Sequence, residues 1–157
     1  LIGDVVKFTS TKPFRIKITG RTKSYINTFG EELIIENTDT ALLETCNFLE
    51  CEVKDYTVAP IFIDDKSGGH QWLIEFKNLP SDLSLFTTEL DKNLKKLNSD
   101  YTSKRTKNLI INLPEIVCLK KGAFYKWLSR YNRLGGQYKI PRLSNTRKIA
   151  DEILAFQ

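Results

Sequence analysis

Apolar and polar residues alternate through residues 5–20. Two alternating stretches flank Lys12 and Pro13, and Gly20 ends the second stretch, which is typical of two strands joined by a turn. A short strand follows, interrupted at Gly30. The pattern therefore predicts that the chain opens with a β-hairpin.

A second antiparallel pair of strands is expected in residues 52–64 and 70–78, which also alternate apolar with polar residues. The pair Gly68–Gly69 lies between them and is interpreted as part of the connecting turn. A further strand is expected in residues 108–119. Pro114 interrupts this strand and favours an edge position or a bulge, because proline has no N–H group to donate to a neighbouring strand.

Spacings of three and four residues predict the helices. The first helix is expected to have Asn37 or Thr38 as its N-cap and to bury one face: Ala41, Leu42, Thr45, Cys46 and Leu49. A single long helix is expected from Ser81 onwards, with one buried stripe: Leu83, Phe86, Leu90, Leu94, Leu97 and Tyr101. Shorter helices are expected in residues 121–132 and from near Ser144.

The order of these elements indicates the fold class. Strands and helices do not follow the regular period of a parallel sheet, and two adjacent strands are joined by a tight turn. We therefore expect an α+β fold, a small mixed or antiparallel sheet flanked by helices, with an N-terminal β-hairpin. A length of 157 residues, 41% of them hydrophobic, suits one compact domain. No apolar run approaches the ~18 residues of a membrane helix, so a soluble chain is expected.

Three cysteines, Cys46, Cys51 and Cys118, match neither a disulfide framework nor the spacing of zinc ligands. Reduced, buried thiols and a cytoplasmic location are therefore expected, and no metal site is predicted. Methionine is absent and the chain begins at Leu1, which suggests a fragment of a longer protein.

Few residues suit ordinary catalytic sets. His70 is the only histidine, and it is interpreted as a hydrogen-bonding residue at a strand end rather than as a member of a triad. Glu31 and Glu32 precede a helix, where carboxylates interact favourably with the helix dipole. A structural role is expected for both.

Positive charge is concentrated in the second half of the chain. The net charge is +5, and residues 101–148 hold twelve Lys or Arg residues but only one acidic residue, Glu115. A solvated basic face is the ordinary interpretation, and the more specific ones are binding of nucleotide phosphates or of nucleic acid. The apolar residues among these charges recur at helical spacing, which favours the buried side of a helix over a base-stacking surface: Phe124, Trp127, Leu128 and Tyr131.

The stretch of residues 133–143 holds one lysine in an uncommon setting. Gly135 and Gly136 allow the backbone ahead of Lys139 to change direction, whereas Pro141 restricts the backbone after it. No apolar pattern would bury the side chain, so it is a candidate for delivery to a phosphate. An exposed lysine without a special role is the common alternative.

Two earlier places combine charge with an accessible backbone. Asp4 precedes a strand, where its carboxylate could accept hydrogen bonds from ribose hydroxyls. Arg21 and Lys23 directly follow Gly20, in a turn suited to a hinge.

These features occur in the order found in adenylate-forming enzymes, the superfamily of acyl-CoA synthetases, firefly luciferase and peptide-synthetase adenylation domains. More closely, the chain resembles the C-terminal part of the auxin-responsive Gretchen Hagen family of acyl-acid amido synthetases, especially its bacterial members. The motifs that carry the resemblance run from residue 3 to about residue 148: GDVVKF, GRTKSYINTFGEELIIEN, HQWLIEF, LNSDYTSKR and GGQYKIPRLSNTRK.

The resemblance implies a role for single residues. Asp4 and Arg21 would bind ATP through its ribose, with Arg21 also near the phosphates. Lys23 would lie at the hinge, and Asn27 replaces a lysine that some relatives use in their second half-reaction. Lys139 would be the catalytic lysine of adenylation, and three residues ahead of it would support its loop: Gly135, Gly136 and Gln137.

The resemblance also implies a reaction and partners. A small carboxylic acid would attack ATP in the presence of Mg²⁺, and rotation of the C-terminal domain would then admit an amino-acid amine. Residues 1–22 would be a hairpin remnant of the N-terminal adenylation domain plus the hinge, and residues 23–157 the lid domain. Because ATP and Mg²⁺ would be bound mainly by the N-terminal domain, the isolated chain would be inactive. No nucleic acid or membrane partner is expected.

Two other classes of function stay open from the sequence. The first is a basic anion- or nucleic-acid-binding module, which the charge of residues 101–148 suggests. The second is a regulatory domain that binds a small ligand.

Overall fold

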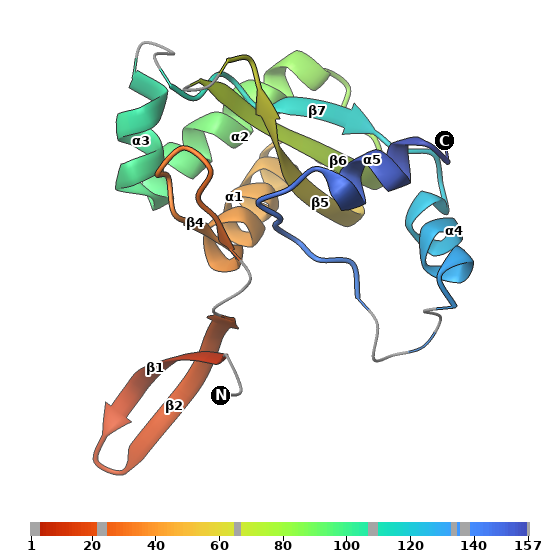
Figure 1. Ribbon diagram of the computed structural model, residues 1–157. Coiled ribbons are helices and arrows are strands. Elements are labelled where there is room, and N and C mark those ends of the chain that lie inside the picture. The colour runs from red at the N-terminus through yellow and green to blue at the C-terminus, as the bar shows by residue number, and fades with distance from the viewer. Residues whose placement is uncertain are drawn as a thin grey trace.

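A three-stranded sheet lies at the centre of the computed structural model (Figure 1), with the strand order β5–β6–β7. Strands β5 (Glu52–Phe62) and β6 (Gly68–Asn78) are antiparallel, and β7 (Glu115–Cys118) pairs with β6 in parallel. The sheet is therefore mixed, and β7 follows Pro114 at its edge, as the sequence predicts. The structure describes residues 4–21, 25–64, 67–106, 110–132, 135 and 139–156.

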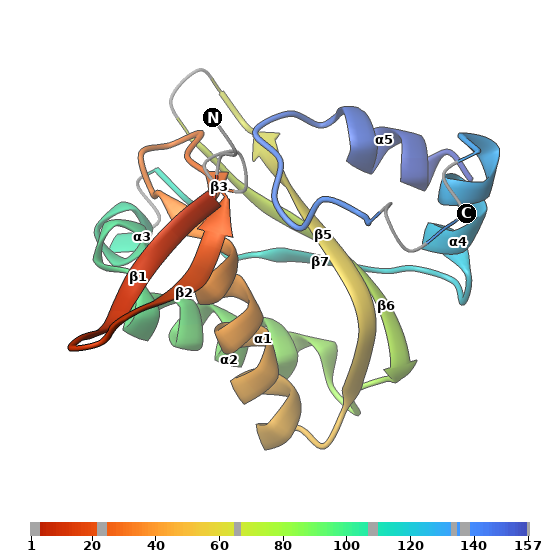
Figure 2. The same ribbon diagram turned by 90° about the horizontal axis from the view of Figure 1, so that it is seen from below.

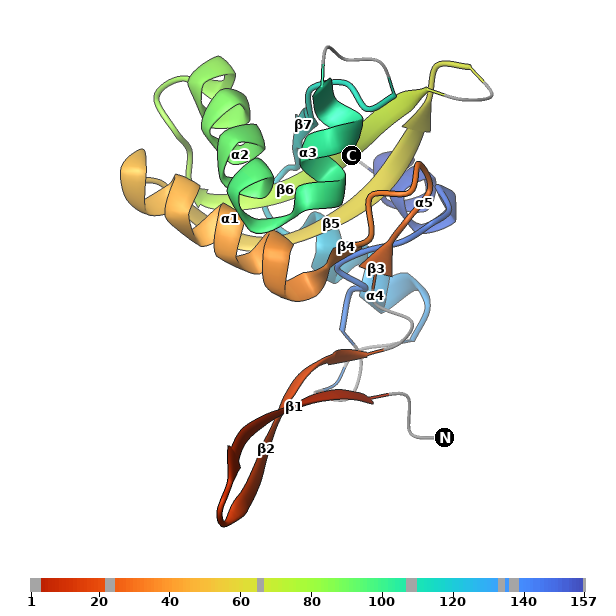
Figure 3. The same ribbon diagram turned by 90° about the vertical axis from the view of Figure 1, so that its left-hand side faces the viewer.

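One face of the sheet packs on α1 (Ile35–Phe48), α2 (Leu83–Leu97) and α3 (Ser99–Arg105) (Figure 3). Trp72 and Ile74 of β6 point into this larger core. Because side chains alternate along a strand, the residue between them points the other way.

The opposite face packs on α4 (Ala123–Arg130) and α5 (Lys148–Leu154) (Figure 2). Leu73 of β6 lies in this smaller core, where Phe124 and Trp127 of α4 are buried. The central strand is covered on both faces, so its side chains are buried from Gly68 through Phe76. The observed fold confirms the expected α+β class.

The N-terminal hairpin extends away from the sheet and its helices (Figures 1 and 3). It consists of β1 (Asp4–Thr11) and β2 (Phe14–Arg21), with the turn at Lys12 and Pro13. A separate short pair, β3 (Tyr25–Ile26) and β4 (Leu33–Ile34), precedes α1.

Gly68–Gly69 does not form the turn that the sequence predicts. Both glycines belong to β6, and the turn lies in the residues before them. A Cβ atom on Gly68 would lie 1.9 Å from the Ile61 carbonyl oxygen of β5. Glycine is required there because the two backbones approach too closely for a side chain.

The predicted long helix is two helices, because Asn98 between them has an extended backbone, with φ −144° and ψ 115°. Its side-chain oxygen accepts a hydrogen bond from Tyr101 N at 2.7 Å and caps α3. Tyr101 is buried as expected, but Leu83 is 41% exposed.

Two predicted helix starts are also wrong. The first helix begins at Ile35, ahead of the expected caps, and Asn37 reaches back from its first turn to accept a hydrogen bond from Ile34 N at 3.3 Å. The last helix begins at Lys148 rather than near Ser144, because Ser144 N donates to the β5 residue Val58.

The thiols are free, as expected: Cys46 and Cys51 are buried and Cys118 is partly buried. Burial raises the pKa of Cys46 to about 12, so this thiol stays protonated and serves packing. Among the described residues, no helix has the length and apolar character needed to cross a bilayer.

Candidate functional site

Lys139 lies on the surface at the point where the chain returns to the domain. Its side chain is exposed, whereas Ile140 directly after it is buried in the smaller core. Gly135, ahead of it, has φ +147°, a backbone conformation that other residues rarely adopt. Gly136 and Gln137 lie outside the described residues. An exposed amine is therefore mounted between a glycine turn and an anchored residue.

The chain after Lys139 is bonded to the outer edge of β5. Thr57 Oγ1 donates to Pro141 O at 2.7 Å. Val58 N donates to Arg142 O at 2.8 Å, and Val58 O accepts from Ser144 N at 3.0 Å. These bonds satisfy backbone groups that an edge strand would otherwise leave unpaired, and they hold the segment of residues 140–144 in place.

Arg142 adds a side-chain anchor to the same edge. Its guanidinium group forms an ion pair with Asp55 and lies 4.5 Å from the centre of the Tyr56 ring. That ring stacks in turn on Trp72 in the larger core, with ring centroids 5.5 Å apart. Stacking on an aromatic face suits the planar guanidinium group. The anchor therefore connects the segment of residues 140–144 to the centre of the sheet.

Asn145 connects this segment to the first strand after the predicted hinge. Its Oδ1 accepts from Asn27 N at 2.8 Å and from Thr28 Oγ1 at 3.5 Å, and its Nδ2 donates to Tyr25 O at 3.0 Å. Hydrogen bonds thus join positions 118 residues apart in the sequence. We refer to these contacts as the Asn145 bridge.

The structure also brings together two predicted nucleotide-binding positions. Asp4 and Arg21 are register partners across β1 and β2, so both lie at the open end of the hairpin. Lys23, the predicted hinge residue, lies outside the described residues.

Glu31 and His70 form a buried pair away from the exposed lysine. His70 Nε2 donates to Glu31 Oε1 at 2.8 Å, and the Glu31 carboxylate also accepts from Phe29 N at 2.7 Å. Burial alone would raise the pKa of Glu31, but the bond from His70 and the backbone N–H groups hold it below the ordinary value. The expected structural roles of both residues agree with these contacts, although Glu31 stabilises the β3–β4 loop rather than a helix terminus.

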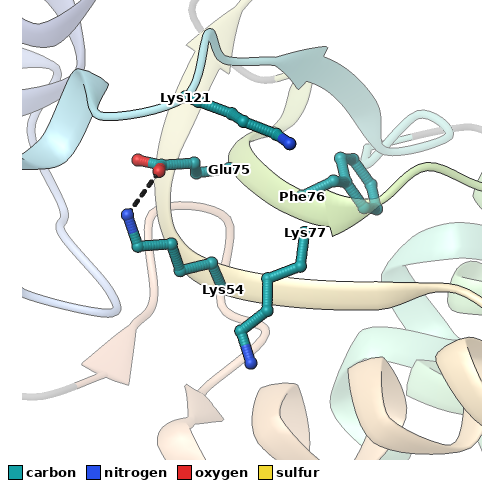
Figure 4. A pocket seen from close by; sticks show the side chains of 5 residues that line it. All are labelled: Lys54, Glu75, Phe76, Lys77 and Lys121. Atoms are coloured by element: carbon teal, nitrogen blue, oxygen red, sulfur yellow. Dashed lines mark hydrogen bonds and ion pairs between the residues drawn. The ribbon is translucent and has the colours of Figure 1, made fainter.

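Three lysines line a small pocket together with Glu75 and Phe76, and of the three only Lys54 points its amine towards the buried Glu75 carboxylate (Figure 4). Lys54 Nζ donates to Glu75 at 2.7 Å, and Lys77 forms an ion pair with Glu52. Lys121 approaches from the segment ahead of α4. Because two of the three ammonium groups are already paired with carboxylates, the pocket offers little net positive charge to a phosphate.

A wider groove of about 460 Å³ runs between α1 and β5, with Arg142 at one side. Its floor includes Cys46 and Cys51, whose thiols are buried. Tyr56 OH donates to Asp39 Oδ1 at 2.6 Å at its rim. Asp39 of α1 and Tyr56 of β5 are thus bonded to each other across the groove.

Within the described part of the chain, no group of three His, Cys, Asp or Glu residues is arranged to hold a metal ion. Mg²⁺ has no evident ligand set among these side chains, since it prefers several oxygen ligands in an octahedral arrangement.

The sequence alone did not reveal the two anchors of the lysine segment. Arg142 and Asn145 both lie in the GGQYKIPRLSNTRK motif, yet their partners are far away in the sequence. In the sequence, Arg142 and Asn145 stand near the expected start of the last helix and have no evident role as its N-cap. This was the only sign of another role. A specific long-range hydrogen bond cannot be inferred from such a signal.

Comparisons with known proteins place the chain in a family. Residues 36–148 match the model of the GH3 family C-terminal domain. A search of curated proteins found no match.

Two solved structures share the fold. One is described as GH3.15 acyl acid amido synthetase, with a TM-score of 0.76 and 20% sequence identity. The other is AtGH3.15 acyl acid amido synthetase in complex with 2,4-DB, with a TM-score of 0.76 and 18% identity. Each comparison covers 99% of this chain but 30% of the other. The chain thus spans about a third of the length of these proteins.

The family match covers most of the chain and includes β5, β6 and the Lys139 segment. It also agrees with the family that the sequence motifs resemble. The chain therefore belongs to the GH3 family, whose C-terminal domain it contains.

Proposed function

We propose that the chain is the C-terminal lid domain of an ATP-dependent enzyme that adenylates a carboxylic acid and transfers the acyl group to an amino-acid amine. Membership in the GH3 family supports this proposal. So does the fold shared with two proteins named as acyl acid amido synthetases, of which this chain covers 30%. The enzyme would be a ligase only together with its N-terminal domain.

The setting of Lys139 is the observation that carries the proposal. Its amine is exposed, and the residues after it are fixed to β5. A positive charge near the α-phosphate offsets the repulsion between an incoming carboxylate and the phosphate, and it stabilises negative charge in the transition state. A lid that rotates can place this charge for adenylation and remove it before the amine attacks the acyl-adenylate.

The hairpin fits a role at the boundary between the domains. In this proposal residues 1–22 belong to the N-terminal adenylation domain and the hinge, and residues 23–157 form the lid. Phe8 and Phe14 are 60% and 78% exposed on the hairpin, an amount of apolar surface that suits packing against a further domain. Asp4 and Arg21, as register partners, would contact the ribose of ATP from this boundary.

ATP and Mg²⁺ would be held mainly by the N-terminal domain. Mg²⁺ commonly binds together with substrate phosphates, so it would enter with ATP. The small carboxylic acid and the amino acid would also bind at the interface of the two domains.

The alternative of a basic anion- or nucleic-acid-binding module is not favoured. Phe124 and Trp127 are buried in the smaller core, and Leu128 packs against it, so these residues are not displayed for base stacking. Tyr131, which was expected on the same buried side, is 40% exposed, so that part of the prediction is wrong.

The test is the substitution Lys139→Ala in the full-length enzyme, with ATP–pyrophosphate exchange as the measure of adenylation. We expect exchange to fall ~100-fold or more, because one charge at the transition state is lost. The thermal midpoint should not change, since Lys139 is exposed. Lys126→Ala, which removes an exposed lysine of α4, is the matched control and should exchange normally. Unchanged exchange in Lys139→Ala would remove this lysine from the mechanism.

A further inference from the structure

The Asn145 bridge joins two parts of the chain that the proposed reaction needs to move together. Tyr25 O and Asn27 N lie directly after the predicted hinge at Lys23, and both are bonded to the Asn145 side chain at 3.0 and 2.8 Å. Figure 3 shows β3 beside the chain that leads into α5. Lys139 stands only six positions before Asn145 in this chain.

Both ends of the bridge are fixed to the central sheet. On one side, Ser144 N donates to Val58 O of β5 at 3.0 Å. On the other side, Thr28 N donates to Glu31 Oε1 at 3.2 Å, and Glu31 is held by His70 of β6. The Asn145 side chain joins these two anchored segments, so β5, β6 and the residues after the predicted hinge are all linked through it.

The bridge contributes more to geometry than to stability. Asn145 is exposed, and water competes for hydrogen bonds at such a position, so each bond stabilises the fold only modestly. Three bonds from one amide nevertheless fix the segment in direction as well as distance. A side chain with these properties is suited to orienting a neighbouring segment.

We propose that Asn145 is a positioning residue. Its side chain holds residues 139–144, which include Lys139, in a fixed position relative to β3, the strand that follows the predicted hinge. The inference rests on the proposed function. Rotation about the hinge then transmits directly to the Lys139 amine, which reaches the α-phosphate in one defined position. Without the bridge, the segment would retain its anchors on β5 but would lose its fixed relation to β3.

The experiment uses the full-length enzyme and measures the two half-reactions separately. Asn145→Ala removes the whole bridge. Asn145→Asp keeps the acceptor for Asn27 N but places an oxygen against Tyr25 O. Thr146→Ala is the control, because it removes a hydroxyl 3.4 Å from Ser144 Oγ and leaves the bridge intact.

We expect ATP–pyrophosphate exchange to fall about 10-fold or more in Asn145→Ala, because small displacements of a catalytic group cost that much in rate. The loss should be in kcat rather than in the KM for ATP. The exchange rate of Asn145→Asp should lie between those of Asn145→Ala and the wild type. The exchange rate of Thr146→Ala should equal that of the wild type. Amide formation from a supplied acyl-adenylate, which does not need Lys139, should keep its rate in all three.

Two results would overturn the assignment. Normal exchange in Asn145→Ala would show that the bridge does not position Lys139. An equal loss in both half-reactions, together with a lower thermal midpoint, would show a general structural role instead. Failure of the proposed function is separable from both, because it appears as normal exchange in Lys139→Ala.

Discussion

Gly68 and Gly69 are adjacent residues of β6 that meet different surroundings. An added Cβ on Gly68 would lie 1.9 Å from Ile61 O and 2.5 Å from the Phe29 ring. The same atom on Gly69 would find its nearest neighbour at 3.8 Å. Backbone atoms of a strand cannot move aside as easily as the end of a flexible side chain. An added Cβ atom should therefore destabilise the fold at Gly68 and not at Gly69.

We therefore predict that Gly68→Ala destabilises the 157-residue chain by about 3 kcal/mol, the upper range for overpacking. Gly69→Ala should change stability by less than about 0.5 kcal/mol, the usual effect of a substitution without a steric conflict. Urea denaturation followed by circular dichroism measures both. Equal stabilities of the two variants would contradict the close approach of β5 at Gly68.

At the scale of elements, the periodicity of the sequence located the segments but not their ends. The spacing from Leu83 to Tyr101 continues across Asn98, so the break between α2 and α3 left no trace in the pattern. Asn98 interrupts the helix because its side chain is bonded elsewhere, to Tyr101 N and to Glu32 O. A tertiary contact of this kind overrides local periodicity.

The same reason separates the predictable and unpredictable parts of the site. The exposure of Lys139 followed from local features, namely the glycines before it and the absence of an apolar pattern. The positions of Arg142 and Asn145 depend on partners in β5 and β3, which only the folded chain brings near. The sequence thus identified the exposed lysine, and the structure was needed for the residues that hold its segment.

The break at Asn98 gives a prediction for these two helices. Asn98→Ala should lower the free energy of unfolding by about 1–2 kcal/mol, because the N-cap of α3 and the bond to Glu32 O are both lost. Ser103→Ala, on the exposed face of α3, is the comparison and should change stability little. Chemical denaturation distinguishes the two, and an equally small effect in Asn98→Ala would argue against a capping role.

For the whole molecule, buried carboxylates connect elements that are distant in sequence. Glu31 of the β3–β4 loop is bonded to His70 of β6, and Glu75 of β6 is bonded to Lys54 of β5. Burial alone would raise the pKa of Glu75, but the bonds from Lys54 and from Gly122 N hold it below the ordinary value. The ionised carboxylates are therefore part of the tertiary structure.

A third buried carboxylate joins the two helices on the larger core. Asp91 of α2 accepts hydrogen bonds from Arg105 Nε at 2.6 Å and from Tyr101 OH at 2.8 Å, both in α3. Burial would raise its pKa, but the bonds from Arg105, Lys95 and Tyr101 outweigh burial and lower it. Protonation of Asp91 would thus loosen the contact between α2 and α3.

These three pKa values fix the sign of the response to acid. Each pKa is lower in the folded chain than the ordinary values of 4.5 for glutamate and 3.8 for aspartate, so the folded state binds protons less readily than the unfolded state. Their stabilisation is complete above the ordinary values and is lost as pH falls through the lowered ones. We predict that the free energy of unfolding changes little between pH 7 and about 5 and then decreases steadily towards pH 3.

Urea titrations across this range measure how the free energy of unfolding depends on pH. In Asp91→Asn, which keeps the shape of the side chain without its charge, the decrease should be shallower. A wild-type profile that stays flat down to pH 3 would show that the three carboxylates do not stabilise the fold as ions.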